Sequence, residues 1–329
     1  MKIKYLVIRF SSIGDIVLTS PVVRCLKQQV EGAEIHFVTK KKHAALVASN
    51  PYIHKVHTFS GNINQLINEL EKEQFDYVID LHQNLRSNRI KSRLKIPAFS
   101  FNKLNFQKFV LVQFKVNRLP QKHIVDRYLE TLSVFDVKND GKGLDFFIPE
   151  NEGFDKSQLP PAFKNGYVAF VIAGTYATKK LPADKITEIC NHANFPIVLL
   201  GGKSETEAGE KIMRETNGNV HNLTGKISLN QSASLVRDAK LVLTNDTGLM
   251  HIAAAFGKKI LSFWGNTVPE FGMVPYQPHP TSKIMEIKNL RCRPCSKLGY
   301  KKCPRKHFRC MREQDVDSAV NWIVRNFNS

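Results

Sequence analysis

Short apolar segments alternate with helix-like segments along most of the chain. Strands separated by helices favour parallel pairing through right-handed crossovers. The pattern occurs once in each half, so the sequence predicts an α/β protein with two doubly wound, Rossmann-like parallel sheets, which we expect to face each other across a cleft. The segments predicted as strands are 4–10, 34–39, a short one around Val56, 77–81, 167–172, 197–200, 241–244 and 259–263.

The length of the chain suits two domains. It has 329 residues, and typical domains contain about 100–150 residues. A polar segment with several glycines and prolines, 138–165, is typical of a connection between domains. We predict an N-terminal domain over 1–150, a C-terminal domain over 151–312, and a C-terminal helix within 313–329 that can pack back on the N-terminal domain.

Apolar runs in the chain are short. None reaches the roughly 18–20 residues that a membrane-spanning helix needs. The stretch from Tyr5 to Phe10 is also too short for the core of a signal peptide. We therefore expect a cytoplasmic protein.

The charge of the chain is strongly positive, +19 at pH 7, and unevenly distributed. No acidic residue occurs from Leu81 through Val125, where phenylalanines interleave with basic residues. A second basic segment, 283–312, has Glu286 as its single acid. Such stretches are often only solvated surface, but this length favours an anionic partner: a membrane surface, a phosphorylated substrate or nucleic acid. The first stretch carries Arg86, Arg89, Lys91, Arg93, Lys95, Lys103, Lys108, Lys115, Arg118 and Lys122.

Four cysteines gather near the C-terminus as C-x2-C-x7-C-x6-C, at Cys292, Cys295, Cys303 and Cys310. In a cytosolic protein such a group more often binds metal than forms disulfides. The second pair lacks the tight spacing of a zinc ribbon, so unligated thiols in a packed loop are favoured. A structural metal site is the alternative.

The clearest sign of a binding site is the turn 245–248, between a predicted strand and a small-residue helix. Backbone N–H groups from Thr247 to Leu249 would point out of the helix N-terminus and attract an anion. Gly248 has no Cβ and would let a phosphate approach closely. His251 lies one turn further on the same helix face. The alternative is an ordinary helix cap at Asp246.

Two further loops that follow predicted strands carry similar chemistry. Thr175 and Lys179 precede a helix and suit a phosphate clamp, with the lysine as a point charge. Glu205 and Glu207 follow a Gly-Gly pair, where a carboxylate can accept from ribose hydroxyls. A threonine-rich loop and acids that complement a helix dipole are the alternatives. Together, the three loops favour a nucleotide diphosphate.

The first strand-to-helix turn, 11–15, reads Ser-Ser-Ile-Gly-Asp. It has neither the G-x-G-x-x-G pattern of a dinucleotide site nor the G-K-[ST] of a P-loop. It does place a carboxylate, Asp15, at the end of a strand, where a general base would be needed. The alternative is that Asp15 only caps its helix.

In combination these motifs resemble the heptosyltransferase family of bacterial lipopolysaccharide assembly, glycosyltransferase family nine. The cysteine-bearing segment 292–311 is similar to that family as well. The likeness runs over almost the whole chain. Its residues are Ser11, Ser12, Gly14, Asp15, Val17, Leu18, Thr19 and Pro21, then Thr175, Lys179, Gly202, Glu205 and Glu207, and finally Asp246, Thr247, Gly248, His251, Ala253 and Ala254.

This resemblance implies a GT-B fold and an inverting transfer, with no cofactor or bound metal, from an ADP-activated heptose to a sugar on the lipid core. Asp15 would be the general base. The family commonly has a tryptophan where this chain has Leu181, so the donor sugar is left open. The implied donor-binding residues are Thr175 and Lys179 for the diphosphate, Thr247 and Gly248 through backbone N–H groups, Asp246 for sugar hydroxyls, Glu205 or Glu207 for the ribose, and His251.

On the acceptor side, the acid-free stretch would receive an anionic lipid-linked saccharide and hold the enzyme at the inner membrane surface. The expected acceptor-binding residues are Ser12, Gly14, Arg86, Arg89 and Lys122. A nicotinamide-dependent dehydrogenase and a polyanion-binding protein are the competing interpretations. We expect no nucleic-acid partner, because no nucleic-acid-binding module is recognisable.

Overall fold

The computed structural model describes residues 2–328 and divides the chain into two compact units. Unit 1 contains residues 2–104 and 122–147, and unit 2 contains residues 105–121 and 148–328. The chain passes from unit 1 into unit 2 for the last time after residue 147, close to the domain boundary expected at 150. The segment 105–121 was assigned to the N-terminal domain but belongs to unit 2, because Leu111 packs against Val268 and Phe271.

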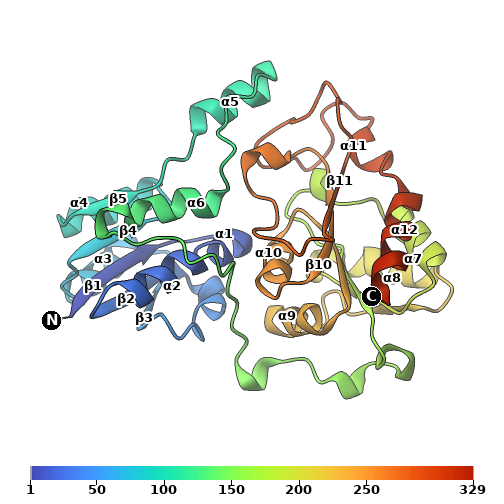
Figure 1. Ribbon diagram of the computed structural model, residues 1–329, viewed down its shortest axis with the longest axis horizontal. Coiled ribbons are helices and arrows are strands. Elements are labelled where there is room, and N and C mark those ends of the chain that lie inside the picture. The colour runs from blue at the N-terminus through green and yellow to red at the C-terminus, as the bar shows by residue number, and fades with distance from the viewer. Residues whose placement is uncertain (1, 329) are drawn as a thin grey trace. The chain divides into compact units, whose positions relative to one another are not determined.

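Unit 1 is a parallel five-stranded sheet in the order β3-β2-β1-β4-β5. The predicted alternation continues one step further than expected, because α4 and β5 form inside the basic stretch (Figure 1). The elements of this unit are β1 (Ile3–Ile8), α1 (Ile13–Val17), α2 (Ser20–Gln29), β2 (Ala33–Lys40), β3 (Lys55–Phe59), α3 (Ile63–Glu71), β4 (Tyr77–Asp80), α4 (Leu85–Leu94), β5 (Ala98–Ser100) and α6 (Ile124–Leu129).

Both faces of the unit 1 sheet are covered by helices, so its central strands are apolar on both sides. Leu6 and Ile8 of β1 belong to a core that also includes Leu66 and Leu70 of α3. Helix α2 contacts α6, and α3 contacts α4. Such double coverage explains why the strands read as continuous apolar runs and not as alternating ones.

Unit 2 is a parallel six-stranded sheet in the order β11-β10-β9-β6-β7-β8. Four of its strands follow the predicted strand segments, whereas β8 and β11 lie outside them. The elements are α5 (Asn105–Phe114), β6 (Val168–Val171), α7 (Ala183–Ala193), β7 (Ile197–Leu200), α8 (Thr206–Arg214), β8 (Val220–Asn222), α9 (Leu229–Asp238), β9 (Leu241–Asn245), α10 (Gly248–Ala255), β10 (Lys259–Trp264), β11 (Lys283–Glu286), α11 (Arg309–Arg312) and α12 (Val316–Phe327).

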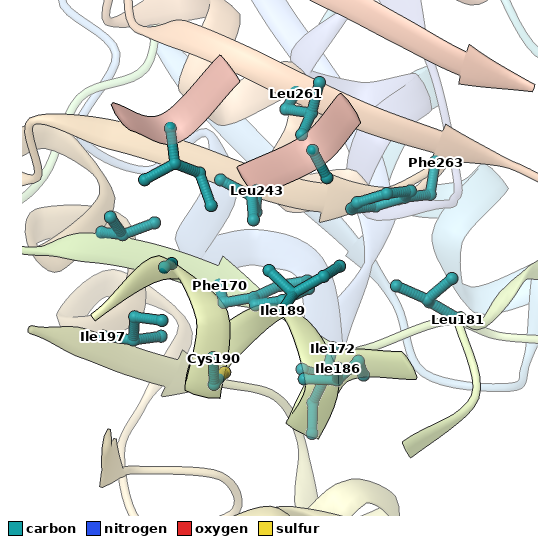
Figure 2. Close-up of a cluster of buried hydrophobic side chains, with 14 of the residues drawn as sticks. Phe170, Ile172, Leu181, Ile186, Ile189, Cys190, Ile197, Leu243, Leu261 and Phe263 are labelled. Carbon is teal, nitrogen blue, oxygen red and sulfur yellow. The ribbon is translucent and has the colours of Figure 1, made fainter. Parts of the chain in front are cut away.

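The core of unit 2 forms where α7 lies on the sheet. Figure 2 shows Phe170, Leu243 and Phe263 of the central strands beside Ile186 and Ile189 of α7. These five side chains are fully or almost fully buried.

The C-terminal helix α12 completes this core, which corrects the expectation that it packs on the N-terminal domain. Trp322 and Ile323 of α12 belong to the same buried cluster as α7, and the two helices are in contact. The Trp322 indole donates a hydrogen bond to the Thr281 carbonyl, 2.8 Å away. The apolar face of α12 is therefore buried within unit 2.

None of the helices between residues 2 and 328 is long and apolar enough to span a bilayer.

Candidate active site

Three of the predicted site loops follow β9, β6 and β7, which are neighbours in the unit 2 sheet. Because these strands are parallel, their carboxyl ends meet at one edge, where ligands bind in sheets of this kind. The structure therefore brings the loops after residues 171, 200 and 245 together. They are far apart in the sequence.

Lys179 and Asp246 form an ion pair across two of these loops. The Lys179 Nζ lies 2.5 Å from the Asp246 Oδ2, and both side chains are largely buried. Thr267, which follows β10, donates a hydrogen bond to the same oxygen at 2.9 Å. The pair holds the lysine ammonium beside the turn that starts α10. Both residues are predicted site residues, but their contact is not evident from the sequence.

Helix α10 begins at Gly248, with Thr247 in an extended conformation at the N-cap. The Thr247 side chain makes no capping hydrogen bond within the described chain; its hydroxyl lies 3.4 Å from that of Thr244. The first N–H groups of a helix have no partner within it and carry its positive end. With Lys179 close by, this end can stabilise a diphosphate. His251 is buried within the first turn.

Asn245 is the residue of this turn whose role the sequence did not reveal. Its side chain is buried at the end of β9, where its Oδ1 accepts from the Leu181 N–H at 3.0 Å and its Nδ2 donates to the Ala173 carbonyl at 3.1 Å. Asn245 thus fixes both ends of the loop that carries Thr175 and Lys179. Its role is to hold this loop.

The loop after β6, which carries Lys179 and is called the clamp loop below, has two threonines with different surroundings. Thr175 is exposed at the loop, whereas Thr178 is buried. The Thr178 hydroxyl accepts from the Tyr300 N–H at 2.8 Å, and the Thr178 N–H donates to the Tyr300 carbonyl at 3.2 Å. Thr178 therefore joins the clamp loop to the cysteine-bearing segment, and only Thr175 is placed to meet a ligand.

The two glutamates after β7 have different surroundings. Glu205 is buried and accepts from the Gly202 N–H at 2.9 Å, while its other oxygen lies 2.5 Å from the Lys180 Nζ. Glu207 is exposed in the first turn of α8. Glu205 therefore ties the loop after β7 to the loop after β6, and Glu207 is the more accessible to a ribose. Lys180 was not identified from the sequence.

In unit 1, Asp15 lies in the first turn of α1, directly after β1. Its Oδ2 accepts from the Ser12 N–H at 3.0 Å and from the Ser12 hydroxyl at 2.6 Å. The other oxygen lies 2.6 Å from the Arg9 Nη2. The helix-cap role weighed from the sequence is thus real, and the Arg9 contact adds to it.

Arg9 and His82 are two neighbours of Asp15 that sequence analysis missed. Arg9 is buried and also donates to the Tyr128 hydroxyl at 2.9 Å. Burial, together with the positive charges of Arg9 and Lys103, lowers the pKa of His82 to about 4. At neutral pH this imidazole is uncharged. It therefore adds no positive charge beside Arg9.

The expected acceptor-binding residues are spread over several elements of unit 1. Gly14 is buried in α1, and Ser12 is occupied with Asp15. Arg86 lies 5.2 Å from the centroid of the Phe59 ring, and Arg89 donates to the Asn64 side chain at 2.8 Å. Lys122 forms an ion pair with Glu130. Arg86 and Arg89 share the exposed surface of α4.

The C-terminal cysteines are free thiols. Burial raises the pKa of Cys295 to about 11 and that of Cys310 to about 12, with a further contribution from the neighbouring thiols. The Cys292 Sγ lies 3.8 Å from the His307 Nε2. Among residues 2–328, no group of three metal-type ligand atoms close enough to share an ion includes a cysteine.

Comparison with known proteins adds to this geometry. A model of glycosyltransferase family 9 (heptosyltransferase) matches residues 63–303. The chain is 26% identical over 297 residues to lipooligosaccharide heptosyltransferase 2 of Haemophilus ducreyi, covering 82% of this chain and 85% of that one. The Haemophilus influenzae protein of the same name is 23% identical over 291 residues, covering 81% and 84%.

Among solved structures, the ADP-heptose lipopolysaccharide heptosyltransferase II of E. coli superposes with a TM-score of 0.74. The alignment has 19% identity and covers 99% of both chains. This likeness confirms the predicted fold class, two parallel-sheet α/β domains of the GT-B type.

Proposed function

Because the chain belongs to glycosyltransferase family 9, the heptosyltransferase family, we propose that it transfers a heptose, or a related sugar, from an ADP-activated donor to an anionic lipopolysaccharide-core lipid. The observation that carries this proposal is the N-terminus of α10 with Lys179 held beside it by Asp246. The similarity to lipooligosaccharide heptosyltransferase 2 and to an ADP-heptose lipopolysaccharide heptosyltransferase supports the choice of donor and acceptor.

In the proposed donor site, the diphosphate lies at the start of α10. Lys179 and the N–H groups of Thr247 and Gly248 stabilise the charge that develops on the leaving ADP. Preorganised donors of this kind contribute most in a site that excludes water. Asp246, already oriented by Lys179 and Thr267, binds sugar hydroxyls. Thr175 contacts the phosphates.

The ribose is assigned to Glu207, because the Glu205 carboxylate already binds Gly202 and Lys180. Glu205 then acts by holding the loop after β7 in place. His251, buried in the first turn of α10, is also assigned to the donor site.

Asp15 is the proposed general base. It takes the proton of the acceptor hydroxyl as that oxygen attacks the anomeric carbon and the bond to the diphosphate breaks, with inversion at that carbon. A positioned base typically contributes about 10²–10⁴-fold to the rate. Arg9 and Ser12 each hold one carboxylate oxygen of Asp15, so its orientation is fixed before the substrate binds. No metal or cofactor is needed for this step.

The acceptor and the membrane are assigned to the acid-free stretch. Ser12, Gly14, Arg86, Arg89 and Lys122 are the proposed contacts for the anionic saccharide. Helix α5, within the same stretch, exposes 68% of Phe106, 52% of Phe109 and 66% of Phe114. Aromatic side chains among basic residues suit the interface of an anionic bilayer. We therefore assign the enzyme to the cytoplasmic face of the inner membrane, without a nucleic-acid partner.

The test is release of ADP from ADP-heptose, measured with and without a heptose-deficient lipopolysaccharide acceptor. We expect release that depends on the acceptor, together with a heptosylated lipid in the mass spectrum. A panel of other nucleotide sugars tests the donor in the same assay. Absence of acceptor-stimulated release from every nucleotide sugar would contradict the proposal.

A further inference from the structure

A cluster of histidines and glutamates lies in unit 1, outside the proposed donor, base and acceptor sites. His36 is in β2 and His57 in the neighbouring strand β3, and both are buried. Glu73 lies in the turn between α3 and β4. This turn lies at the amino end of β4, whereas Asp15 follows the carboxyl end of β1. Because β1 and β4 are parallel, Glu73 and Asp15 lie toward opposite ends of the strands.

Three ligand atoms of this cluster converge. The His36 Nδ1 is 3.0 Å from the His57 Nε2 and 3.8 Å from the Glu73 Oε2, and the three residues can each offer one ligand atom within 4.8 Å of the others. Ligand atoms around a tetrahedral zinc ion, with bonds of about 2.0–2.2 Å, are separated by roughly 3.3–3.5 Å. The observed separations lie on either side of that value. Small side-chain rotations would therefore complete the geometry.

A second carboxylate orients His36. Its Nε2 lies 3.3 Å from the Glu34 Oε1, which places the ring proton on Nε2 and leaves the lone pair of Nδ1 directed at the cluster. A metal-binding histidine usually has such a carboxylate partner on its other nitrogen. Glu34 therefore gives His36 the orientation that a metal-binding histidine needs.

The surroundings hold the three groups in place. The Phe75 ring packs edge-on against His36, with centroids 5.0 Å apart. Lys55 lies 2.5 Å from the Glu73 Oε1, so it fixes that carboxylate by one oxygen while the other approaches the histidines. In the same way, the Lys2 Nζ lies 3.1 Å from the Glu34 Oε2 and holds that carboxylate.

We propose that unit 1 binds one divalent transition-metal ion, with zinc as the best match, through the His36 Nδ1, the His57 Nε2 and the Glu73 Oε2. Two imidazoles and a carboxylate are a typical ligand set for zinc, and water fills the fourth position. In the absence of the ion, the His57 Nε2–H donates to the His36 Nδ1. Binding moves that proton to the His57 Nδ1, so no proton is released.

The ion would cross-link β2, β3 and the turn after α3, and would have no part in sugar transfer. It would stabilise the fold of unit 1 by binding the folded chain and not the unfolded one. The proposal is independent of the donor and acceptor assignments, because none of its residues belongs to them.

The experiment uses the full chain after treatment with a chelator. Zinc binding is measured by equilibrium dialysis, and thermal unfolding is followed with and without zinc. We expect His57→Gln and Glu73→Gln each to lose one bound zinc per chain and to abolish the zinc-dependent rise in Tm. Glu34→Gln should weaken zinc binding by about 10–100-fold, as loss of an orienting partner does. His192→Gln, on the exposed surface of α7, is the control and should change neither quantity.

Zinc held by the C-terminal cysteines must be distinguished from zinc at this site. The double variant Cys292→Ser, Cys295→Ser should keep the zinc that His57→Gln loses, and Co²⁺ bound to it should show no thiolate charge-transfer band. Zinc binding that persists in both His57→Gln and Glu73→Gln would overturn the proposal, as would the absence of zinc binding to the wild-type chain. If His57→Gln does not fold, Glu73→Gln decides, since its side chain lies at the surface of the cluster.

Discussion

At the scale of single residues, the same side chain can serve the local fold and the proposed chemistry. Asp15 caps α1 through Ser12 and also pairs with Arg9. Asp246 pairs with Lys179 at the start of α10. In both cases a carboxylate is oriented by groups that belong to the fold. The cap and the catalytic interpretations of Asp15 are therefore compatible.

Asp15→Asn should lower kcat by about 10²–10⁴-fold, because the amide cannot take the acceptor proton. ADP binding, measured by calorimetry, should stay within a factor of two or so of wild type. The variant Ser12→Ala, which removes one orienting bond but keeps the base, should lose much less activity. Wild-type turnover in Asp15→Asn would reduce Asp15 to a helix cap.

Lys179→Ala should weaken ADP binding by about 1.5–3 kcal/mol, the usual contribution of a hydrogen bond to a charged group. Adenosine binding should hardly change, because the lysine is assigned to the phosphates. Lys185→Ala, a surface lysine of α7 paired with Glu188, is the matched control. Equal losses for ADP and adenosine would argue against the clamp.

At the scale of elements, ion pairs between distant segments hold helices in place. Arg24 of α2 binds both oxygens of Asp140 at 2.8 Å. This bidentate pair attaches α2 to the last segment of unit 1. The hydrogen bonds from Arg24 lower the pKa of Asp140 to about 2.

We expect the ion pair between Arg24 and Asp140 to make the free energy of unfolding depend on pH. Because the pKa of Asp140 is lower in the folded chain than its ordinary value of 3.8, its stabilisation is complete above about pH 4 and is lost as the pH falls toward 2. Asp140→Asn should therefore reduce the free energy of unfolding at pH 7, and the difference from wild type should shrink on acidification. Glu31→Gln, an exposed change in the same unit, should show no such trend. Urea denaturation across this pH range measures both.

At the scale of the whole molecule, the net charge of +19 and the acid-free stretch favour the anionic partner that we propose. The sum of charges attracts an anionic surface over about a Debye length. The phenylalanines exposed on α5 add an apolar contact that nucleic acid would not require. Both features are needed for the proposed membrane association.

Replacing Phe106 and Phe109 with serine should weaken binding to vesicles that contain phosphatidylserine, because it removes the exposed apolar surface. Raising the salt concentration should weaken binding by the wild-type chain as well. Val324→Ser, which replaces another exposed apolar side chain, on α12, serves as the control in a co-sedimentation assay. Undiminished vesicle binding by the α5 variant would refute the role of that helix.

The sequence alone determined most of the strand and helix alternation, a turn at 245–248 followed by a helix, and the position of Asp15 after the first strand. These depend on residues that are close together in the chain. It did not reveal that Asn245 holds the loop that carries Thr175 and Lys179, or that α12 completes the unit 2 core.

Only the tertiary structure placed Lys179 against Asp246, Arg9 against Asp15, and His36 against His57 and Glu73. These contacts depend on the strand orders β9-β6-β7 and β3-β2-β1, which bring together residues from different parts of the chain. A local pattern specifies the conformation of a segment. The order in which segments pair follows from burying all their apolar faces at once, and that order decides which polar side chains meet.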